Sequence, residues 1–212
     1  MKGLLFFALM WLAATLHAAE LERVNIDLTD QAALRDGAQT FVNYCMGCHS
    51  AQFQRYERVA ENLGLSHEQA LDTLILTGAK LGDPMLSSLP PAQAKLWFGA
   101  APPDLTLVAR VRGDDWLYGY LRGFYADSSR PWGVNNRVLP DVAMPNVLEP
   151  LQAGLPAVQF DLKVKNLVAF LAYSANPIKV QSQRVGAYVL LYLLVFLSFA
   201  FLLKREYWKD VH

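Results

Sequence analysis

The segment Cys45-Met46-Gly47-Cys48-His49 constrains this chain more than any other part of its sequence. Two thiols three positions apart can each add to one vinyl group of a haem, and the adjacent imidazole then lies under the iron. The chain has 2 cysteines in 212 residues, so no further pair remains to form a disulfide. The pattern predicts one haem c, covalently attached through Cys45 and Cys48, with His49 as an iron ligand.

Two other kinds of site also use closely spaced cysteines. A Cys-x-x-Cys pair serves as the redox centre of thioredoxin-like proteins, but there it follows a strand in an alternating strand–helix pattern that is absent here. A structural zinc site needs four ligands, and the two cysteines with His49 supply three. Both alternatives are therefore less favoured than haem attachment.

The N-terminal segment 1–19 has the pattern of a secretory signal peptide. Lys2 provides a positive start, an apolar run extends from Gly3 to Leu16, and Ala18 and Ala19 are small residues at the expected cleavage region. The apolar run is shorter than the roughly 20 residues that span a bilayer. An uncleaved anchor is the alternative, and both interpretations predict that the following domain is exported.

A second apolar run, Val185 to Leu203, contains 19 residues without a charge. Lys204 and Arg205 end it, and Tyr207 and Trp208 are aromatic residues of the kind that lie at membrane interfaces. We expect a membrane anchor with its flanks at 179–208, preceded by a periplasmic haem domain at 20–178 and followed by a cytoplasmic tail at 209–212. This predicts a single-pass protein of a bacterial inner membrane, in contact with membrane lipid.

The rest of the chain predicts an all-α domain of the class I cytochrome c kind, with short helices and long loops around one haem. Apolar residues recur at helical spacing, and capping residues mark several helix starts. Proline- and glycine-rich stretches separate these segments, and few runs alternate with the period of a strand. The expected helices cover 30–44, 67–77, 91–98, 114–124 and 160–174.

The iron's second axial ligand decides what the haem can do. Met144 lies in Val142-Ala143-Met144-Pro145-Asn146, where the proline disfavours helix and keeps the backbone extended, as suits a loop that presents a thioether. Met85 and His67 remain weaker candidates, since one fits an apolar loop contact and the other a solvated helix start. Histidine–methionine ligation is typical of electron carriers, whereas an open position would indicate gas binding or peroxide chemistry.

Four segments together resemble cytochrome c1, the haem subunit of ubiquinol–cytochrome c oxidoreductase. They are the haem motif, the loop Gly99-Ala100-Ala101-Pro102-Pro103-Asp104-Leu105-Thr106, the segment Ala143-Met144-Pro145-Asn146, and the C-terminal apolar run. The resemblance implies that His49 and Met144 ligate the iron and that Arg110 reaches a haem propionate. It also implies that the carbonyl of Pro102 or Pro103 accepts the ring proton of His49. The stretch 122–144 is compact and has no extra cysteines, unlike larger members.

The resemblance implies an electron-transfer subunit rather than an enzyme on its own. Its expected partners are a cytochrome b subunit, a Rieske iron–sulfur subunit that donates electrons, and a periplasmic cytochrome c that accepts them. The 19 basic and 19 acidic residues balance, so composition gives no indication of nucleic-acid binding. Three alternatives stay open: a membrane-anchored monohaem cytochrome of another respiratory enzyme, a haem-based sensor, and a peroxidase.

Overall fold

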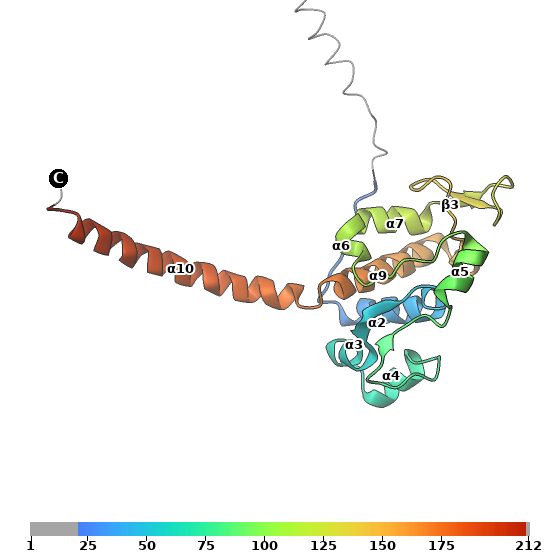
Figure 1. Cartoon of the computed structure of the whole chain (residues 1–212), viewed down its shortest axis with the longest axis horizontal. Helices are drawn as coiled ribbons and strands as arrows, with labels where there is room; N and C mark the ends of the chain where they lie inside the picture. The colour runs from blue at the N-terminus through green and yellow to red at the C-terminus, as the bar shows by residue number, and fades with distance from the viewer. Residues whose placement is uncertain (1–20, 211–212) are drawn as a thin grey trace, which may run out of the picture.

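A computed structural model describes residues 21–210 of the chain. The predicted signal peptide at 1–19 and the last two residues of the predicted tail lie outside the described residues. Within the described part the chain is mostly helical, with one long apolar helix at its C-terminal end (Figure 1), so the predicted helical fold is confirmed.

Short helices and irregular loops form the domain from which the C-terminal helix extends. The helix α2 (Gln31–Thr40) continues directly into one π-helical turn, η1 (Phe41–Cys45). The remaining helices in the described residues are α3 (Tyr56–Asn62), α4 (His67–Thr73), α5 (Pro91–Phe98), α6 (Val108–Arg112), α7 (Asp114–Arg122), α8 (Glu149–Gly154), α9 (Ala157–Ala175) and α10 (Lys179–Tyr207).

Two of the predicted helices are shorter than expected, and one is longer. The helix expected at 67–77 ends at Thr73, because the chain turns there to bury Leu74 completely. The helix expected to include Phe124 ends at Arg122, because Phe124 pairs with Asn136 in a small sheet. The helix expected from Phe160 begins three residues earlier, directly after Pro156.

Two small antiparallel sheets, each of two strands, were not predicted. β1 (Ala51–Arg55) pairs with β2 (Pro84–Met85), and β3 (Phe124–Ala126) pairs with β4 (Val134–Asn136). The first sheet joins the segment that follows the haem motif to the loop that contains Pro84 and Met85. The second sheet forms a hairpin ahead of Met144. Both sheets therefore hold loops that surround the site.

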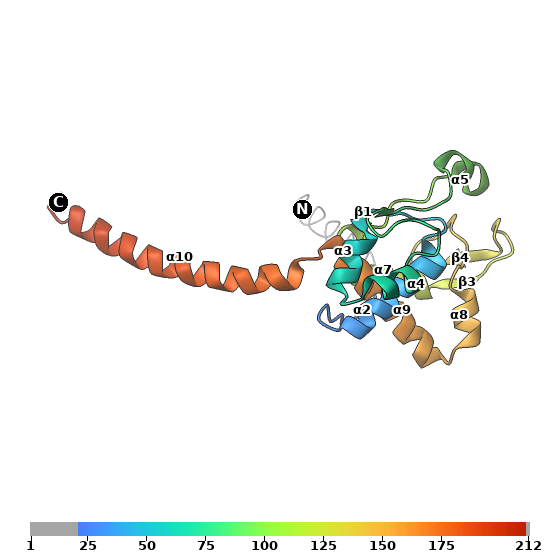
Figure 2. The same cartoon turned by 90° about the horizontal axis from the view of Figure 1, so that it is seen from below.

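The core of the domain is the crossing of α2 and α9, which lie side by side in Figures 1 and 2. Gly37 allows this close approach, because a Cβ atom there would lie 2.0 Å from the backbone oxygen of Asn166. Next to it, the rings of Phe41 and Phe170 pack with centroids 5.5 Å apart. This crossing sets the position of η1 and of the cysteine motif that follows it.

The helix α10 extends away from the domain as a separate arm (Figure 2). It has 29 residues, a mean hydropathy of 2.4 over its most apolar window, and none of that window is buried. At 1.5 Å per residue it is about 43 Å long, which exceeds the roughly 30 Å of a bilayer's hydrocarbon core. By length and composition it is a candidate transmembrane helix.

Candidate haem site

The end of η1 places both cysteines at one cavity. Cys45 is the last residue of the π-helical turn, and the N–H groups of Cys48 and His49 donate to its carbonyl at 3.1 and 2.9 Å. Cys45 is buried and Cys48 is half-buried, and both line the cavity. Burial raises the pKa of the Cys45 thiol to about 12, so this thiol is neutral in the folded chain.

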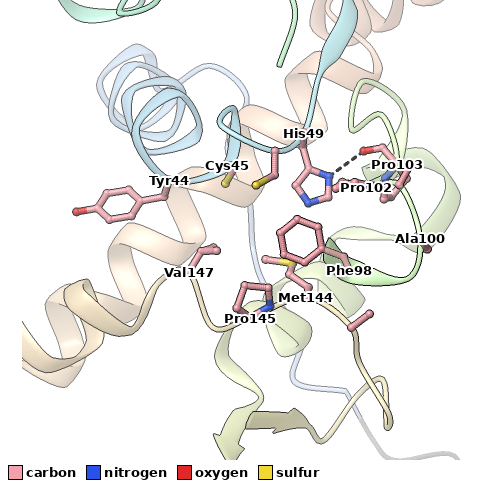
Figure 3. A pocket seen from close by; sticks show the side chains of 13 residues that line it. Tyr44, Cys45, His49, Phe98, Ala100, Pro102, Pro103, Met144, Pro145 and Val147 are labelled. Atoms are coloured by element: carbon pink, nitrogen blue, oxygen red, sulfur yellow. Dashed lines mark hydrogen bonds between the residues drawn. The ribbon is translucent and has the colours of Figure 1, made fainter. Parts of the chain in front are cut away.

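The ring of His49 is oriented by the loop after α5. Its Nδ1 donates a hydrogen bond to the carbonyl of Pro103 at 2.8 Å, which leaves Nε2 for the cavity (Figure 3). Burial lowers the pKa of His49 below 6.5, and the contact with Pro103 and the charge of Asp104 oppose this shift. The structure therefore holds a neutral imidazole in one tautomer, as a metal-ligating histidine requires.

The Pro103 loop is itself tied to the segment that follows the motif. Leu105 N–H donates to the carbonyl of Ser50 at 2.8 Å. The Asp104 carboxylate accepts from the N–H groups of Gln52 at 2.8 Å and Thr106 at 3.0 Å. The sequence placed Asp104 in a family motif, and the structure shows that it connects the two segments that orient His49.

Two adjoining cavities meet at the motif, with empty volumes of about 590 and 940 Å³. The residues that line both cavities come from three segments: the motif, the loop 99–106 (the proline loop) and the loop around Met144 (the 140s loop). They are Cys45, His49, Pro103, Ala143 and Met144. The structure thus joins three segments that are far apart in the sequence.

Met144 lies across the cavity from His49 in Figure 3 and is half-buried. Tyr120, a buried residue of α7, donates from its hydroxyl to the Met144 sulfur at 3.4 Å. Burial raises the pKa of Tyr120 to about 12, so its hydroxyl remains protonated and able to donate. Met144 therefore presents its thioether to the same cavity as the imidazole of His49.

The profile of the Cytochrome C1 family matches residues 77–211, which include the proline loop, Met144 and α10. The chain belongs to the cytochrome c1 family. Its family membership implies a c-type haem and supports a haem electron-transfer role.

Of three curated relatives, two carry the cytochrome c1 name and one carries another name. Cytochrome c1 of Allochromatium vinosum is 41% identical over the whole of both chains. The ammonia monooxygenase gamma subunit of Nitrosomonas europaea is 39% identical over 91% of this chain and 89% of that protein. Mitochondrial cytochrome c1 of Neurospora crassa is 28% identical over 91% of this chain and 68% of that protein.

Both Arg110 and Arg112 are exposed, but the structure does not bring Arg110 to the lining of either cavity. Arg112, one half-turn further along α6, lines the larger cavity instead. Its guanidinium lies 4.9 Å from the centroid of the Trp116 ring. Sequence reasoning missed Arg112, and its cation–π spacing to Trp116, four residues later on the next helix, is the signal that could have indicated it.

The two weaker candidate ligands, Met85 and His67, lie elsewhere, and so does the side chain of the motif residue Met46. Met85 is fully buried in β2, and His67 is exposed at the first position of α4. The sulfur of Met46 accepts a hydrogen bond from Tyr56 at 3.4 Å within the core. None of the three lines the two cavities at the motif.

The residues present fit a haem of the cytochrome c1 family. A neutral imidazole and a thioether face one cavity, two thiols lie at its edge, and its lining is predominantly apolar. Across residues 21–210, no group of three or more His, Cys, Asp or Glu side chains gathers in a way that could hold a metal ion. The sheets in the same residues are small and antiparallel, unlike the pattern of a thioredoxin-like site.

Proposed function

We propose that this chain is the haem subunit of a ubiquinol–cytochrome c oxidoreductase, in which it transfers single electrons. Its partners in this proposal are a cytochrome b subunit, a Rieske iron–sulfur subunit as donor and a periplasmic c-type cytochrome as acceptor. The observation that carries the proposal is the shared cavity of Cys45, Cys48, His49 and Met144 in a member of the cytochrome c1 family.

In this proposal, Cys45 and Cys48 would hold one haem c through thioether bonds, and His49 and Met144 would bind its iron. The haem supplies a reversible one-electron couple between ferrous and ferric iron. The carbonyl of Pro103 keeps the ring of His49 in one tautomer, and the apolar lining limits the access of water. With His49 and Met144 both bound to the iron, the site would favour electron transfer over binding of exogenous ligands.

A haem also carries two propionates, which need cationic or hydrogen-bonding partners. Arg112 lines the larger cavity and is the better placed of the two arginines on α6. We propose that its planar guanidinium pairs with a propionate, a geometry that suits arginine more than lysine. The role of Arg110, which the family resemblance implied, stays a prediction.

We further propose that α10 anchors the chain with the haem domain at 20–178 on the periplasmic side and the tail at 209–212 in the cytoplasm. The length and apolar character of α10 and the signal-like segment 1–19 support this orientation. A tether of this kind keeps the domain at high effective concentration beside its membrane partners. Protease added to spheroplasts should degrade the haem domain, whereas protection of the domain would contradict the orientation.

The decisive experiment for ligation compares Met144→Leu with Met85→Leu, a buried methionine outside both cavities. We expect Met144→Leu to keep its covalent haem but to lose the spectrum of histidine–methionine ligation and to show a much lower reduction potential. Met85→Leu should retain the wild-type spectrum. Unchanged ligation spectra in Met144→Leu would exclude Met144 as the iron ligand.

The relative named as an ammonia monooxygenase subunit favours a second candidate, a membrane-anchored cytochrome that serves another enzyme. Purification of the native protein in mild detergent, with haem staining and identification of its subunits, distinguishes the two candidate functions. A b-type cytochrome and an iron–sulfur subunit should co-purify if the first proposal holds. Their absence, with a monooxygenase subunit in their place, would favour the second.

A further inference from the structure

The hydroxyl of Tyr120 contacts the sulfur of Met144. The distance between Tyr120 Oη and Met144 Sδ is 3.4 Å, within the range of a hydrogen bond to sulfur. Tyr120 is 9% exposed, so water cannot readily replace this contact. A thioether sulfur carries two lone pairs, and it can bind iron with one while it accepts a weak hydrogen bond with the other.

The ring of Tyr120 is held in place from several sides. It stacks on Trp116 at 4.9 Å with an interplanar angle of 8°, and its ring meets that of Phe124 edge-on at 5.4 Å. The side chain of Asn136 donates to the backbone carbonyl of Tyr120 at 2.7 Å. Among residues 21–210 the hydroxyl has no hydrogen-bond partner other than Met144. The surrounding contacts therefore direct this hydroxyl at the sulfur.

We propose that Tyr120 is a positioning residue that hydrogen-bonds the sulfur of Met144 and thereby raises the reduction potential of the haem. This inference rests on the proposed ligation by Met144. A donor at the sulfur withdraws electron density, which makes the thioether a weaker donor to ferric iron. The oxidised state then loses more stabilisation than the reduced state, and the potential rises.

Tyr120→Phe removes the hydroxyl and keeps a ring that can stack on Trp116. We expect an unchanged content of covalent haem, an altered sulfur-to-iron charge-transfer band in the ferric protein, and a lower midpoint potential. The expected size is about a threefold change in the equilibrium constant for reduction, or about 30 mV at 59 mV per tenfold for one electron.

Tyr118→Phe is the matched control. Tyr118 is a buried residue of the same helix, but its ring lies beneath the guanidinium of Arg122 at 4.6 Å and lines neither cavity. We expect the same potential and the same charge-transfer band as in the wild type. An equal shift in both variants would show a general effect of removing a hydroxyl from α7 and would overturn the inference.

A double-mutant cycle with Met144→Leu tests whether the effect passes through the sulfur. In the Met144→Leu background, Tyr120→Phe should leave the potential unchanged, because no sulfur remains to accept the bond. A shift that persists there, or no shift in the Tyr120→Phe single variant, would overturn the inference. Unchanged ligation in Met144→Leu itself would instead contradict the proposed function, so the two failures are distinguishable.

Discussion

The Asp104 carboxylate accepts a hydrogen bond of 2.8 Å from the backbone N–H of Gln52, across 52 positions of sequence. The other oxygen of the same carboxylate accepts from Thr106 N–H, within the loop that carries Pro103. One side chain thus joins the strand that follows the haem motif to the loop that orients His49. The aspartate of the Pro-Pro-Asp-Leu segment therefore fixes this loop to the strand β1.

We expect Asp104→Ala to lower the free energy of unfolding by about 1–3 kcal/mol, since two backbone N–H groups lose their acceptor. The hydrogen bond between His49 and Pro103 should also weaken, which would broaden the distribution of haem spectra. Urea denaturation of the detergent-solubilised protein measures the first effect. Asp72→Ala, on the exposed face of α4, is the control and should leave the stability near that of the wild type. Equal stabilities in the two variants would contradict this role of Asp104.

The segment before Met144 is held by Arg130. Its guanidinium pairs with the Asp141 carboxylate at 2.9 Å and donates to the Asp141 carbonyl at 2.8 Å and the Val142 carbonyl at 3.4 Å. Asp141 has a φ of 62°, a left-handed conformation that costs energy for a residue with a side chain. Its N–H donates to Asn135 at 2.9 Å. These contacts hold the loop without a disulfide.

Arg130→Ala should loosen this loop and make Met144 easier to displace. We expect a folded protein with covalent haem whose ferrous form binds carbon monoxide more readily than the wild type, and whose free energy of unfolding falls by about 1–3 kcal/mol. Arg130→Lys keeps the charge opposite Asp141 but lacks the fork that reaches both carbonyls, so it should give an intermediate result. Carbon monoxide titrations identical in all three proteins would exclude this role for Arg130.

The sequence predicts those helices whose apolar periodicity and capping residues lie within the helix itself. The stripe of apolar residues over 30–44 corresponds to α2 and η1, and the segment Pro91–Phe98 forms a helix with the predicted bounds. The π-helical geometry of η1 could not be predicted, because one extra residue in a turn barely changes the apolar pattern. β1 was missed because Gln52 and Gln54 do not look like strand residues. Gln54 is nevertheless buried, and its amide donates to the carbonyl of Ser174 at 2.8 Å, a contact across 120 positions.

The candidate site also contains residues that the sequence could indicate and residues that depend on tertiary packing. The residue types at the motif and the proline after Met144 indicate chemistry directly, so the sequence could nominate Cys45, Cys48, His49 and Met144. Which arginine of α6 faces the cavity depends on the rotation of a five-residue helix, so the sequence could not single out Arg112, whereas Arg110 was named only through the family resemblance. The contact between Tyr120 and Met144 depends on the packing of α7 against the 140s loop, which no local pattern encodes.

The hairpin of β3 and β4 should respond to acid through Asp127. Hydrogen bonds from the side chain of Ser129, the side chain of Asn135 and the N–H of Ser129 lower the pKa of this carboxyl below 3.8. Because the unfolded chain then binds more protons, the stability from these contacts is present above pH 3.8 and is lost as the pH falls through the lower folded pKa. Denaturation midpoints followed from pH 6 to about pH 3 should fall less steeply in Asp127→Asn than in the wild type. Parallel curves would contradict this contribution.

The crossing of α2 and α9 predicts a strong effect of a small substitution at Gly37. Alanine would gain about 1 kcal/mol of helix propensity, but its Cβ would lie 2.0 Å from the backbone oxygen of Asn166 and 2.9 Å from Cβ of Phe170. A backbone oxygen cannot move aside without shifting α9, so we expect Gly37→Ala to lower the free energy of unfolding by about 1–3 kcal/mol or more and to reduce the yield of haem-loaded protein. Gly154→Ala, at the end of α8 with no atom within 4 Å of the added Cβ, should be neutral or slightly stabilising. Urea denaturation and haem content, measured on both variants, test the pair. If Gly37→Ala matched Gly154→Ala, the two helices could not cross as closely as the structure has them, and the placement of the haem motif by that crossing would have to be abandoned.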